Sequence, residues 1–231
     1  MNRPLEILYE DNHCLAVAKP SGVVSAHFQG QEPTLDLLAK DYLKQKHHKP
    51  GRVFLGIVQR LDRPVSGVLL FARTSKAAAR LAQQFRDGTV EKVYWAVIEG
   101  SLAFPAGTLR DYLKKDPERR RVEVVMPRTP GARDSELRYQ VRAQDDGLSL
   151  LEIRPETGRT HQLRVQLGHR GHPIYGDAKY GSRHRFGNAI ALHARSLEFA
   201  HPIRHERILL TADMPVSWRN EFASLFRQVP Q

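Results

Sequence analysis

The sequence predicts an α+β fold built around a largely antiparallel sheet. Short apolar runs stand in pairs around turn residues, which is typical of β-hairpins. A few segments between these pairs place apolar residues at helical spacing. No internal repeat and no low-complexity tract interrupts this arrangement. Hairpins with a few interspersed helices indicate an antiparallel sheet flanked by helices and loops.

The N-terminal part predicts a hairpin followed by a turn. Residues 5–9 and 15–18 are short apolar runs on either side of Asp11-Asn12-His13, which is typical of a hairpin turn. Lys19-Pro20-Ser21-Gly22 then directs the chain away from the hairpin.

A helix and a basic segment follow. Thr34 is placed to cap the helix. The apolar face of this helix would carry Leu35, Leu38 and Tyr42. Residues 44–52 contain several cations and end in Pro50-Gly51-Arg52, so they fit either a solvated loop or a contact with phosphate groups.

The middle of the chain predicts two buried strands, a helix and a third strand. Residues 53–58 and 68–72 are the strands, and residues 91–99 alternate as a further strand. Ser75 is placed to cap the helix between them, and Gly88 ends it. One face of this helix would carry Ala78, Leu81, Ala82 and Phe85.

The second half predicts two hairpins. Residues 109–113 and 119–126 form the first, and residues 135–143 and 148–154 form the second. The first hairpin would present a basic surface suited to RNA, made of Arg110, Lys114, Arg119, Arg120 and Arg121. Thr160 is placed to cap a short helix that runs to Leu167. The tail predicts strands over 189–199 and 208–212 and a last helix from about Ser217.

The chain is strongly basic. It has 231 residues, 41% of them hydrophobic, which is ordinary for a folded protein and sufficient for a substantial core. Its formal net charge is +11 at pH 7. Such a surplus predicts a polyanionic partner, nucleic acid before a membrane surface, because Lys and Arg displace the counterions condensed on phosphates. A basic enzyme without such a partner is the alternative.

The sequence predicts a cytoplasmic protein with a single domain. Cys14 is the only cysteine, so an intrachain disulfide is excluded and a reducing compartment is expected. Met1-Asn2-Arg3-Pro4-Leu5-Glu6 lacks the apolar core of a signal peptide, and no apolar run approaches the roughly 20 residues that span a bilayer. No linker divides the chain, so residues 1–231 are expected to form one catalytic domain without a separate RNA-binding module.

The candidate catalytic acid lies between the two central strands. Gln59-Arg60-Leu61-Asp62-Arg63-Pro64-Val65-Ser66-Gly67 reads as a structured loop, and Asp62 is flanked by Arg60 and Arg63. Nearby cations favour the charged form of a carboxylate, so Asp62 is expected to be ionised. Taken alone, the segment fits an ordinary surface ion pair better than a catalytic site.

A second motif changes that interpretation. Thr157-Gly158-Arg159-Thr160-His161-Gln162-Leu163-Arg164 is followed by Gly171-His172-Pro173-Ile174-Tyr175-Gly176-Asp177. Together with Arg60-Leu61-Asp62 and Lys92-Val93-Tyr94-Trp95-Ala96, these segments resemble the RluA-type pseudouridine synthases over nearly the whole chain. Two positions depart from the pattern: Gln59 stands where the family usually has His, and Pro64-Val65-Ser66 where it often has x-Thr-Ser.

The resemblance implies the pseudouridine synthase fold, with an active-site cleft, and an RNA-modifying isomerase. Asp62 would be the essential carboxylate, Arg164 the ion-pair partner that orients it, and Tyr94 the ring that stacks on the uracil. Arg60 would enter the gap left by the extruded nucleotide. The candidate substrate-binding residues are Arg60, Arg63, Lys92, Arg159, His161 and Leu192.

The implied reaction sets the expected partners. Isomerisation of uridine is redox-neutral, so no cofactor and no nucleotide cosubstrate is expected. The expected partner is RNA, either ribosomal or transfer RNA. A membrane partner is not expected, and a monomer is. Asp62 could attack the sugar or remove a proton from it. Both routes use an ionised, positioned carboxylate, so the sequence leaves both open.

Other functions fit the residues less well. A non-catalytic RNA-binding protein on the same fold is the main alternative, suggested by Gln59 and Val65. The 11 histidines raise the possibility of a metal site, yet there is no Cys pair and no His-Glu-x-x-His. His161 and His169 are better explained as hydrogen-bonding residues. A retaining glycosidase needs two carboxylates about 5 Å apart, and Glu156 is the only nearby acid in the motifs. Phosphate-binding loops and Gly-x-Ser-x-Gly are absent.

Overall fold

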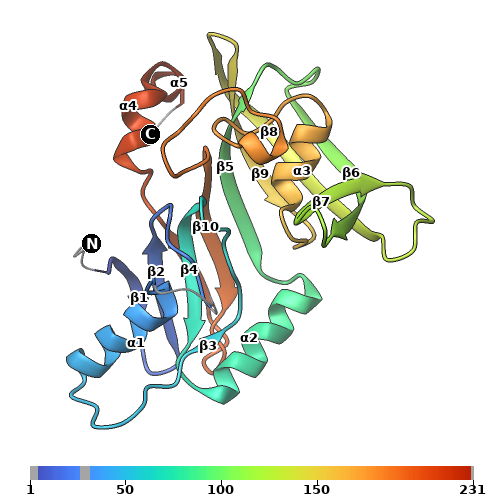
Figure 1. The fold of residues 1–231 in the computed structure, drawn as a ribbon. Coiled ribbons are helices and arrows are strands. Elements are labelled where there is room, and N and C mark those ends of the chain that lie inside the picture. The colour runs from blue at the N-terminus through green and yellow to red at the C-terminus, as the bar shows by residue number, and fades with distance from the viewer. Residues whose placement is uncertain (1–4, 27–31, 230–231) are drawn as a thin grey trace. The chain divides into compact units, whose positions relative to one another are not determined.

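The computed structural model describes residues 5–26 and 32–229, and these form two compact units (Figure 1). Unit 1 comprises Met1–Lys92 and Ala194–Asp213, and unit 2 comprises Val93–His193 and Met214–Gln231. The start of the N-terminal stretch that lacks a signal-peptide pattern, residues 1–4, lies outside the described residues. That the two units act as one catalytic domain stays a prediction.

Unit 1 is a sheet packed against two helices. Its strand order is β1-β2-β4-β10-β11, with the short β3 also pairing with β4. The strands are β1 (Ile7–Glu10), β2 (Cys14–Lys19), β3 (Gly56–Ile57), β4 (Ser66–Ala72), β10 (Leu192–Ala200, from Ala194 on) and β11 (Arg207–Thr211). The helices are α1 (Leu35–Lys46) and α2 (Ser75–Asp87). Buried side chains of β2, β4, α2 and β10 form its core, among them Ala16, Leu70, Leu81 and Phe199.

Strand β4 is held on both sides at the end that follows the Asp62 loop. Its residue Gly67 lies opposite Lys19 of β2. Gly67 has a φ of +119°, and a Cβ there would lie 2.2 Å from the carbonyl oxygen of Ala194 in β10. Only glycine allows this approach of two backbones.

Unit 2 is an antiparallel sheet of order β5-β9-β8-β6-β7. The strands are β5 (Glu91–Glu99, from Val93 on), β6 (Ala106–Asp116), β7 (Arg121–Val125), β8 (Arg133–Asp145) and β9 (Leu148–Pro155). The helices are α3 (Gln162–His169), the 3₁₀ turn η1 (Ala178–Tyr180), α4 (Val216–Glu221) and α5 (Ala223–Arg227).

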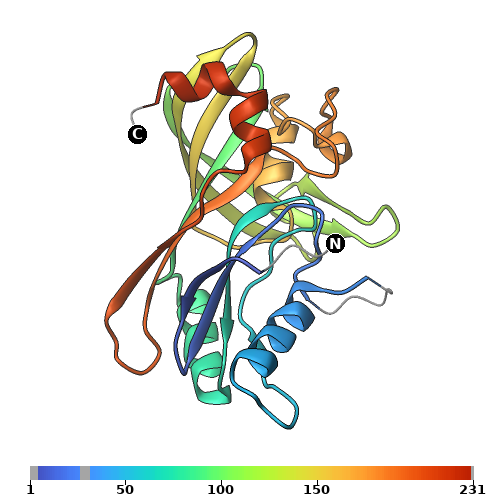
Figure 2. The same ribbon diagram turned by 90° about the vertical axis from the view of Figure 1, so that its left-hand side faces the viewer.

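The two faces of the unit 2 sheet carry different helices. Val165 of α3 packs on Leu113 and Val122. On the other face, Trp95 of β5 stacks on Phe226 of α5 with ring centroids 5.9 Å apart. Figure 2 shows α4 and α5, in red, beside the strands of this sheet. Because successive strand residues alternate between faces, Tyr94 points to the α3 face.

The predicted α+β class is confirmed, and most predicted elements are present. Strand 91–99 has the predicted bounds, whereas predicted strand 53–58 is reduced to β3, and both tail strands start within three residues of the predicted positions. In α1 the predicted apolar face was right at Leu35 and wrong at Leu38, which is 39% exposed; the buried apolar residues are Leu35, Ala39 and Leu43. Tyr42 instead donates a hydrogen bond to Glu10.

Two predicted helix caps were wrong by one residue. Helix α2 is capped by Thr74, whose hydroxyl accepts a hydrogen bond from the Ala77 amide, and Ser75 is its first helical residue. The cap position of α3 is His161, not Thr160. The reason lies in Gln162, whose Oε1 accepts hydrogen bonds from the Arg159 amide and the Thr157 hydroxyl and so fixes the loop before the helix.

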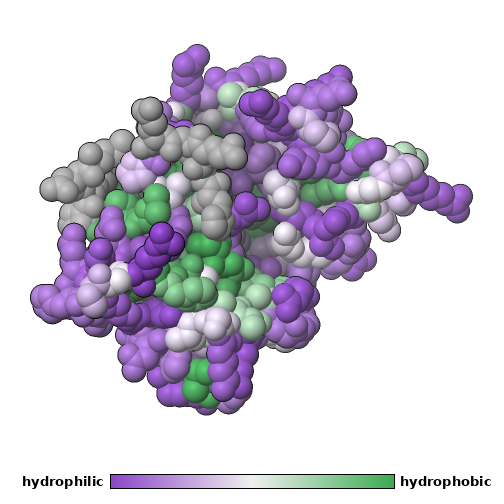
Figure 3. Space-filling view, turned by 60° about the horizontal axis from the view of Figure 1, so that its bottom comes forward, coloured by the Kyte–Doolittle hydropathy of each residue, from purple (hydrophilic) through white to green (hydrophobic). Residues whose placement is uncertain are grey.

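The surface mixes hydrophilic and apolar side chains. Figure 3 shows one face on which an apolar patch lies among hydrophilic side chains. Large apolar residues that remain exposed include Leu37 and Phe54 in unit 1 and Phe104 and Met126 in unit 2. Single exposed apolar residues are common in folded proteins. Within residues 5–26 and 32–229, no helix combines the length and the apolar character needed to cross a membrane.

The corrected cap of α2 can be tested by substitution. Thr74→Ala removes the side chain that satisfies the Ala77 amide and should lower the free energy of unfolding by about 1 kcal/mol. Ser75→Ala, the matched control, should change it by less than about 0.5 kcal/mol. Urea unfolding measures both values, and a larger loss for Ser75→Ala would restore Ser75 as the cap.

Candidate active site

The loop that carries Asp62 is fixed on both sides of that residue. On one side, the Ser25 hydroxyl donates to the Leu61 carbonyl at 2.6 Å and accepts from the Leu61 amide at 3.1 Å. On the other side, the Val65 amide donates to the Asp62 carbonyl at 3.0 Å. Asp62 is half-buried, whereas Arg60 and Arg63 are exposed. The carboxylate therefore lies on a rigid turn between core strands.

The buried side chain of Lys19 also fixes the Asp62 loop. Lys19 is 1% exposed, and its Nζ donates to the carbonyl oxygens of Pro20, Arg63 and Val65 at 2.9, 3.2 and 2.6 Å. Burial lowers the pKa of the Lys19 ammonium to about 7, against the opposing effect of the Asp62 carboxylate. Three carbonyl acceptors match the three donors of an ammonium group.

Arg63, a predicted substrate-binding residue, contacts its own unit. Its Nε donates to the Gly22 carbonyl at 2.9 Å, and its Nη2 lies 2.7 Å from Glu32. Both partners of this ion pair are largely exposed, so solvent screens the pair and it contributes little to stability.

Arg164 is fixed in unit 2 by a buried ion pair with Asp177. Arg164 Nε and Nη2 donate to the two carboxylate oxygens of Asp177 at 2.7 and 2.9 Å. Arg164 is 6% exposed and Asp177 is 2% exposed. A bidentate pair of this kind is short, strong and directional, so it sets the plane of the guanidinium.

Tyr180 completes the surroundings of Arg164. The Arg164 guanidinium carbon lies 5.2 Å from the centroid of the Tyr180 ring. The Tyr180 hydroxyl accepts from the Val122 amide at 3.1 Å and lies 2.7 Å from His161 Nδ1. Burial raises the pKa of Tyr180, so its phenol keeps its proton at neutral pH.

Three other predicted residues of unit 2 lie in the segment before α3 and in β5. His161 has a left-handed φ of 53° at the cap of α3. Arg159, two residues earlier, donates to the carbonyl and the carboxylate of Asp134 at 2.9 and 3.1 Å and ties its loop to β8. Tyr94 lies opposite Ile153 on the α3 face of the sheet and is half-buried.

The predicted residues are thus divided between the units. Asp62, Arg60 and Arg63 share one loop of unit 1, and Lys92 is the last residue of the first segment of that unit. The remaining predicted residues, Tyr94, Arg159, His161, Arg164 and Leu192, belong to unit 2. Leu192 is buried at the start of β10.

Sequence reasoning missed three residues that hold the predicted ones. Lys19 lies in the Lys19-Pro20-Ser21-Gly22 segment, which was expected only to turn the chain. Asp177 lies in the last of the family motifs, and no role of its own was predicted for it. Tyr180 lies three residues after Asp177 and carries no signal of its own. The sequence feature that could have identified Lys19 and Asp177 is a charged residue next to Pro or Gly in an otherwise apolar segment.

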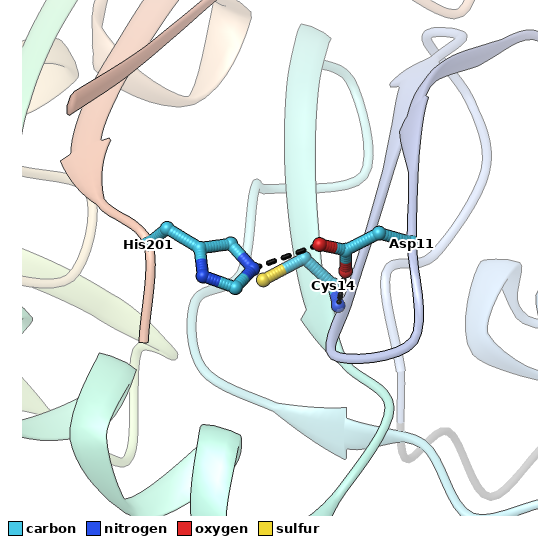
Figure 4. Close-up of side chains that lie close together, drawn as sticks. All are labelled: Asp11, Cys14 and His201. Carbon is cyan, nitrogen blue, oxygen red and sulfur yellow. Dashed lines mark hydrogen bonds and ion pairs between the residues drawn. The ribbon is translucent and has the colours of Figure 1, made fainter. Parts of the chain in front are cut away.

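Asp11, Cys14 and His201 form the one group of potential metal ligands among the described residues (Figure 4). Their ligand atoms lie within 4.8 Å of one another. However, His201 Nδ1 accepts from the amides of Ile203 and Arg204, so Nε2 carries the proton and donates to Asp11 at 2.8 Å.

Asp11 and Cys14 are also poorly suited to bind a metal ion. Asp11 Oδ1 accepts from the amides of His13 and Cys14, and these bonds hold its pKa below the usual range although burial opposes ionisation. Burial raises the pKa of the Cys14 thiol to about 12, so it is not a thiolate at neutral pH. These contacts describe a structural network that ties β1 and β2 to the β10–β11 connection.

Comparison with known proteins gives consistent results. Residues 13–169 match the family model described as RNA pseudouridylate synthase. An uncharacterized RNA pseudouridine synthase of Bacillus subtilis, YhcT, is 37% identical over 94% of this chain and 70% of its own length. The ribosomal large subunit pseudouridine synthase C of Buchnera aphidicola is 31% identical over 93% of this chain and 68% of its own length. The solved structure of human RNA pseudouridylate synthase domain containing 4 has the same fold, with a TM-score of 0.77, 24% identity and coverage of 97% and 92% of the two chains.

The Arg164–Asp177 pair yields a stability prediction. Asp177→Asn removes the carboxylate charge from the bidentate pair with the buried Arg164 guanidinium and should lower the free energy of unfolding by about 3–5 kcal/mol. Asp134→Asn, the matched control, removes a carboxylate that is 72% exposed from its pair with Arg159 and should cost less than about 1 kcal/mol. Urea unfolding measures the loss in free energy of unfolding for both variants. Equal losses would mean that the buried Arg164–Asp177 pair stabilises the fold no more than the exposed pair does.

Proposed function

This chain belongs to the RNA pseudouridylate synthase family, and on that basis we propose that Asp62, Arg164 and Tyr94 form its catalytic centre. The family establishes the reaction: the chain is an isomerase that converts uridine to pseudouridine in RNA. The base is detached from the ribose, turned, and rejoined through a ring carbon, and a proton then leaves that carbon. This chemistry requires a positioned carboxylate beside the sugar and an enclosed space for the free base.

Asp62 is the carboxylate that fits this requirement. The observation that carries the assignment is its place on a loop fixed by Ser25 on one side and Lys19 on the other. A fixed carboxylate needs no reorganisation when charge develops at the sugar carbon, and this lowers the barrier. Direct attack and removal of a sugar proton both depend on this rigidity.

Arg164 supplies the charge that orients Asp62. Its Nε and Nη2 are bonded to Asp177, so the Nη1 edge of the guanidinium is the part that would face Asp62. An ion pair is far stronger in an enclosed site than at a surface. Tyr94 stacks on the uracil ring, and its hydroxyl helps to take the final proton.

The remaining residues serve RNA binding. Arg60 enters the stack in place of the extruded uridine, which offsets part of the few kcal/mol that extrusion costs. Arg63, Lys92, Arg159 and His161 line the path of the RNA, and the buried Leu192 supports it from within the fold. The net charge of +11 supports binding that weakens with salt.

Ribosomal large-subunit RNA is the proposed substrate, because relatives similar over most of this chain are named for it. A transfer RNA is the second candidate. The protein is also proposed to act in the cytoplasm, which its single buried cysteine supports, and to act as a monomer.

The role of Asp62 is tested by mapping pseudouridines. In cells that lack the native gene, the wild-type protein should restore pseudouridine at defined positions of total RNA, and Asp62→Ala should restore none. Asp41→Ala, which removes an exposed acid of α1, is the control and should act as the wild type. Restoration by Asp62→Ala would remove Asp62 from the centre, and the modified positions identify the RNA.

The role of Arg164 is tested by separating catalysis from binding. Arg164→Lys keeps the charge but loses the planar fork, so the turnover rate should fall at least about tenfold while RNA affinity changes less than about threefold. Arg60→Lys should instead affect both. Single-turnover kinetics and filter binding measure the two quantities, and parallel losses for Arg164→Lys would make it a phosphate contact.

A further inference from the structure

Unit 2 has a cavity on the α3 face of its sheet. The cavity has a volume of about 230 Å³ and lies between β7, α3 and η1. Pockets for drug-sized ligands have roughly 300–1,000 Å³, so this one suits a single ring system. Its apolar wall is formed by Val124 and Val165, and Tyr180 closes one side.

Tyr180 connects this cavity to Arg164. The ring lines the cavity, and the guanidinium carbons of Arg121 and Arg164 lie 5.7 and 5.2 Å from its centroid. Its hydroxyl is fixed by Val122 and His161, so the ring cannot turn freely. A group in the cavity would therefore lie against the same side chain that supports Arg164.

The rim offers a hydrogen-bond donor beside an acceptor. Arg121 and Glu123 both line the cavity, with 3.4 Å between Arg121 Nε and Glu123 Oε1. Arg121 Nε is buried and makes no hydrogen bond to any other part of the chain that the structure describes. The long 3.4 Å ion pair with Glu123 is a weak contact for this buried donor, which favours a ligand that accepts from Nε at a shorter distance.

Cations surround the mouth of this cavity. Arg119 and Arg120 are exposed in the turn between β6 and β7. Lys179 of η1 donates to the Arg120 carbonyl and so lies next to that turn. Exposed cations beside an apolar, aromatic pocket are the combination by which proteins bind unpaired nucleotides, with bases against rings and phosphates on cations.

We propose that this cavity, next to the catalytic centre, binds one unpaired base of the substrate RNA. The proposed base is guanine. The inference rests on the proposed function. Guanine presents two adjacent N–H donors to the Glu123 carboxylate and a carbonyl acceptor to Arg121. Val124, Val165 and Tyr180 enclose the ring, and Arg119, Arg120 and Lys179 contact the flanking phosphates.

The lining favours a base over a phosphate group as the occupant. Glu123 lines the cavity beside Arg121 and His169, so the lining is not uniformly basic as a phosphate site would be. The valines cannot hydrogen-bond to phosphate oxygens, whereas they pack well against a flat ring. Phosphates therefore belong on the exposed cations outside.

The test is titration of the full-length protein with guanosine 5′-monophosphate, followed by NMR of labelled valine methyl groups. The nucleotide should shift the Val124 and Val165 signals saturably, and ribose 5-phosphate should not.

Glu123→Gln should weaken this binding about tenfold, the effect of losing a charged hydrogen-bond acceptor. Glu118→Gln makes the same charge change outside the cavity and should bind as the wild type. Val124→Trp, checked for folding by circular dichroism, should abolish binding.

Two results would overturn the proposal. Equal shifts with ribose 5-phosphate would make the cavity a phosphate site, and unchanged binding by Glu123→Gln would place the base elsewhere. Binding is measured without turnover, so Asp62→Ala should bind the nucleotide as the wild type does. If the wild-type protein bound the nucleotide but restored no pseudouridine in cells, the proposed function would fail while the cavity assignment would stand.

Discussion

The buried ion pair between Arg164 and Asp177 is the constraint on which the organisation of unit 2 depends. Both side chains are almost fully removed from water, and each would be strongly destabilising alone. The pair joins α3 to the segment before η1, and Tyr180 and His161 continue the network to β7 and the start of α3. The direction of the Arg164 guanidinium is therefore set by the fold and does not require substrate.

Unit 1 uses a buried charge in a comparable way. Lys19 gathers three backbone carbonyls around the Asp62 loop, and Gly67 lets β4 approach β10 directly after that loop. Each unit therefore presents a charged group whose position is fixed by a buried partner of its own. In the proposed mechanism this rigidity is the main contribution of the protein, because uridine isomerisation needs placement of charge more than added reagents.

Local signals explain what could be predicted from the sequence. The β8–β9 hairpin was placed correctly because its two-residue turn, Asp146-Gly147, has positive φ at both residues, which this pair tolerates. The cap of α2 was misplaced because two hydroxyl residues stand side by side, and sequence alone does not show which one reaches the Ala77 amide. The supports of the site escaped prediction for a different reason. Lys19 meets carbonyls 44 and 46 residues away, and such partners exist only in the folded chain.

The central claim is that Asp62, oriented by Arg164, faces the ribose of the target uridine. A crystal structure of the protein bound to its substrate RNA tests it most directly. The account predicts one Asp62 oxygen within hydrogen-bonding distance of Arg164 Nη1 and the other directed at the extruded ribose, with the uracil on Tyr94. An Asp62 that faces solvent, or an Arg164 that contacts only RNA phosphates, would contradict it.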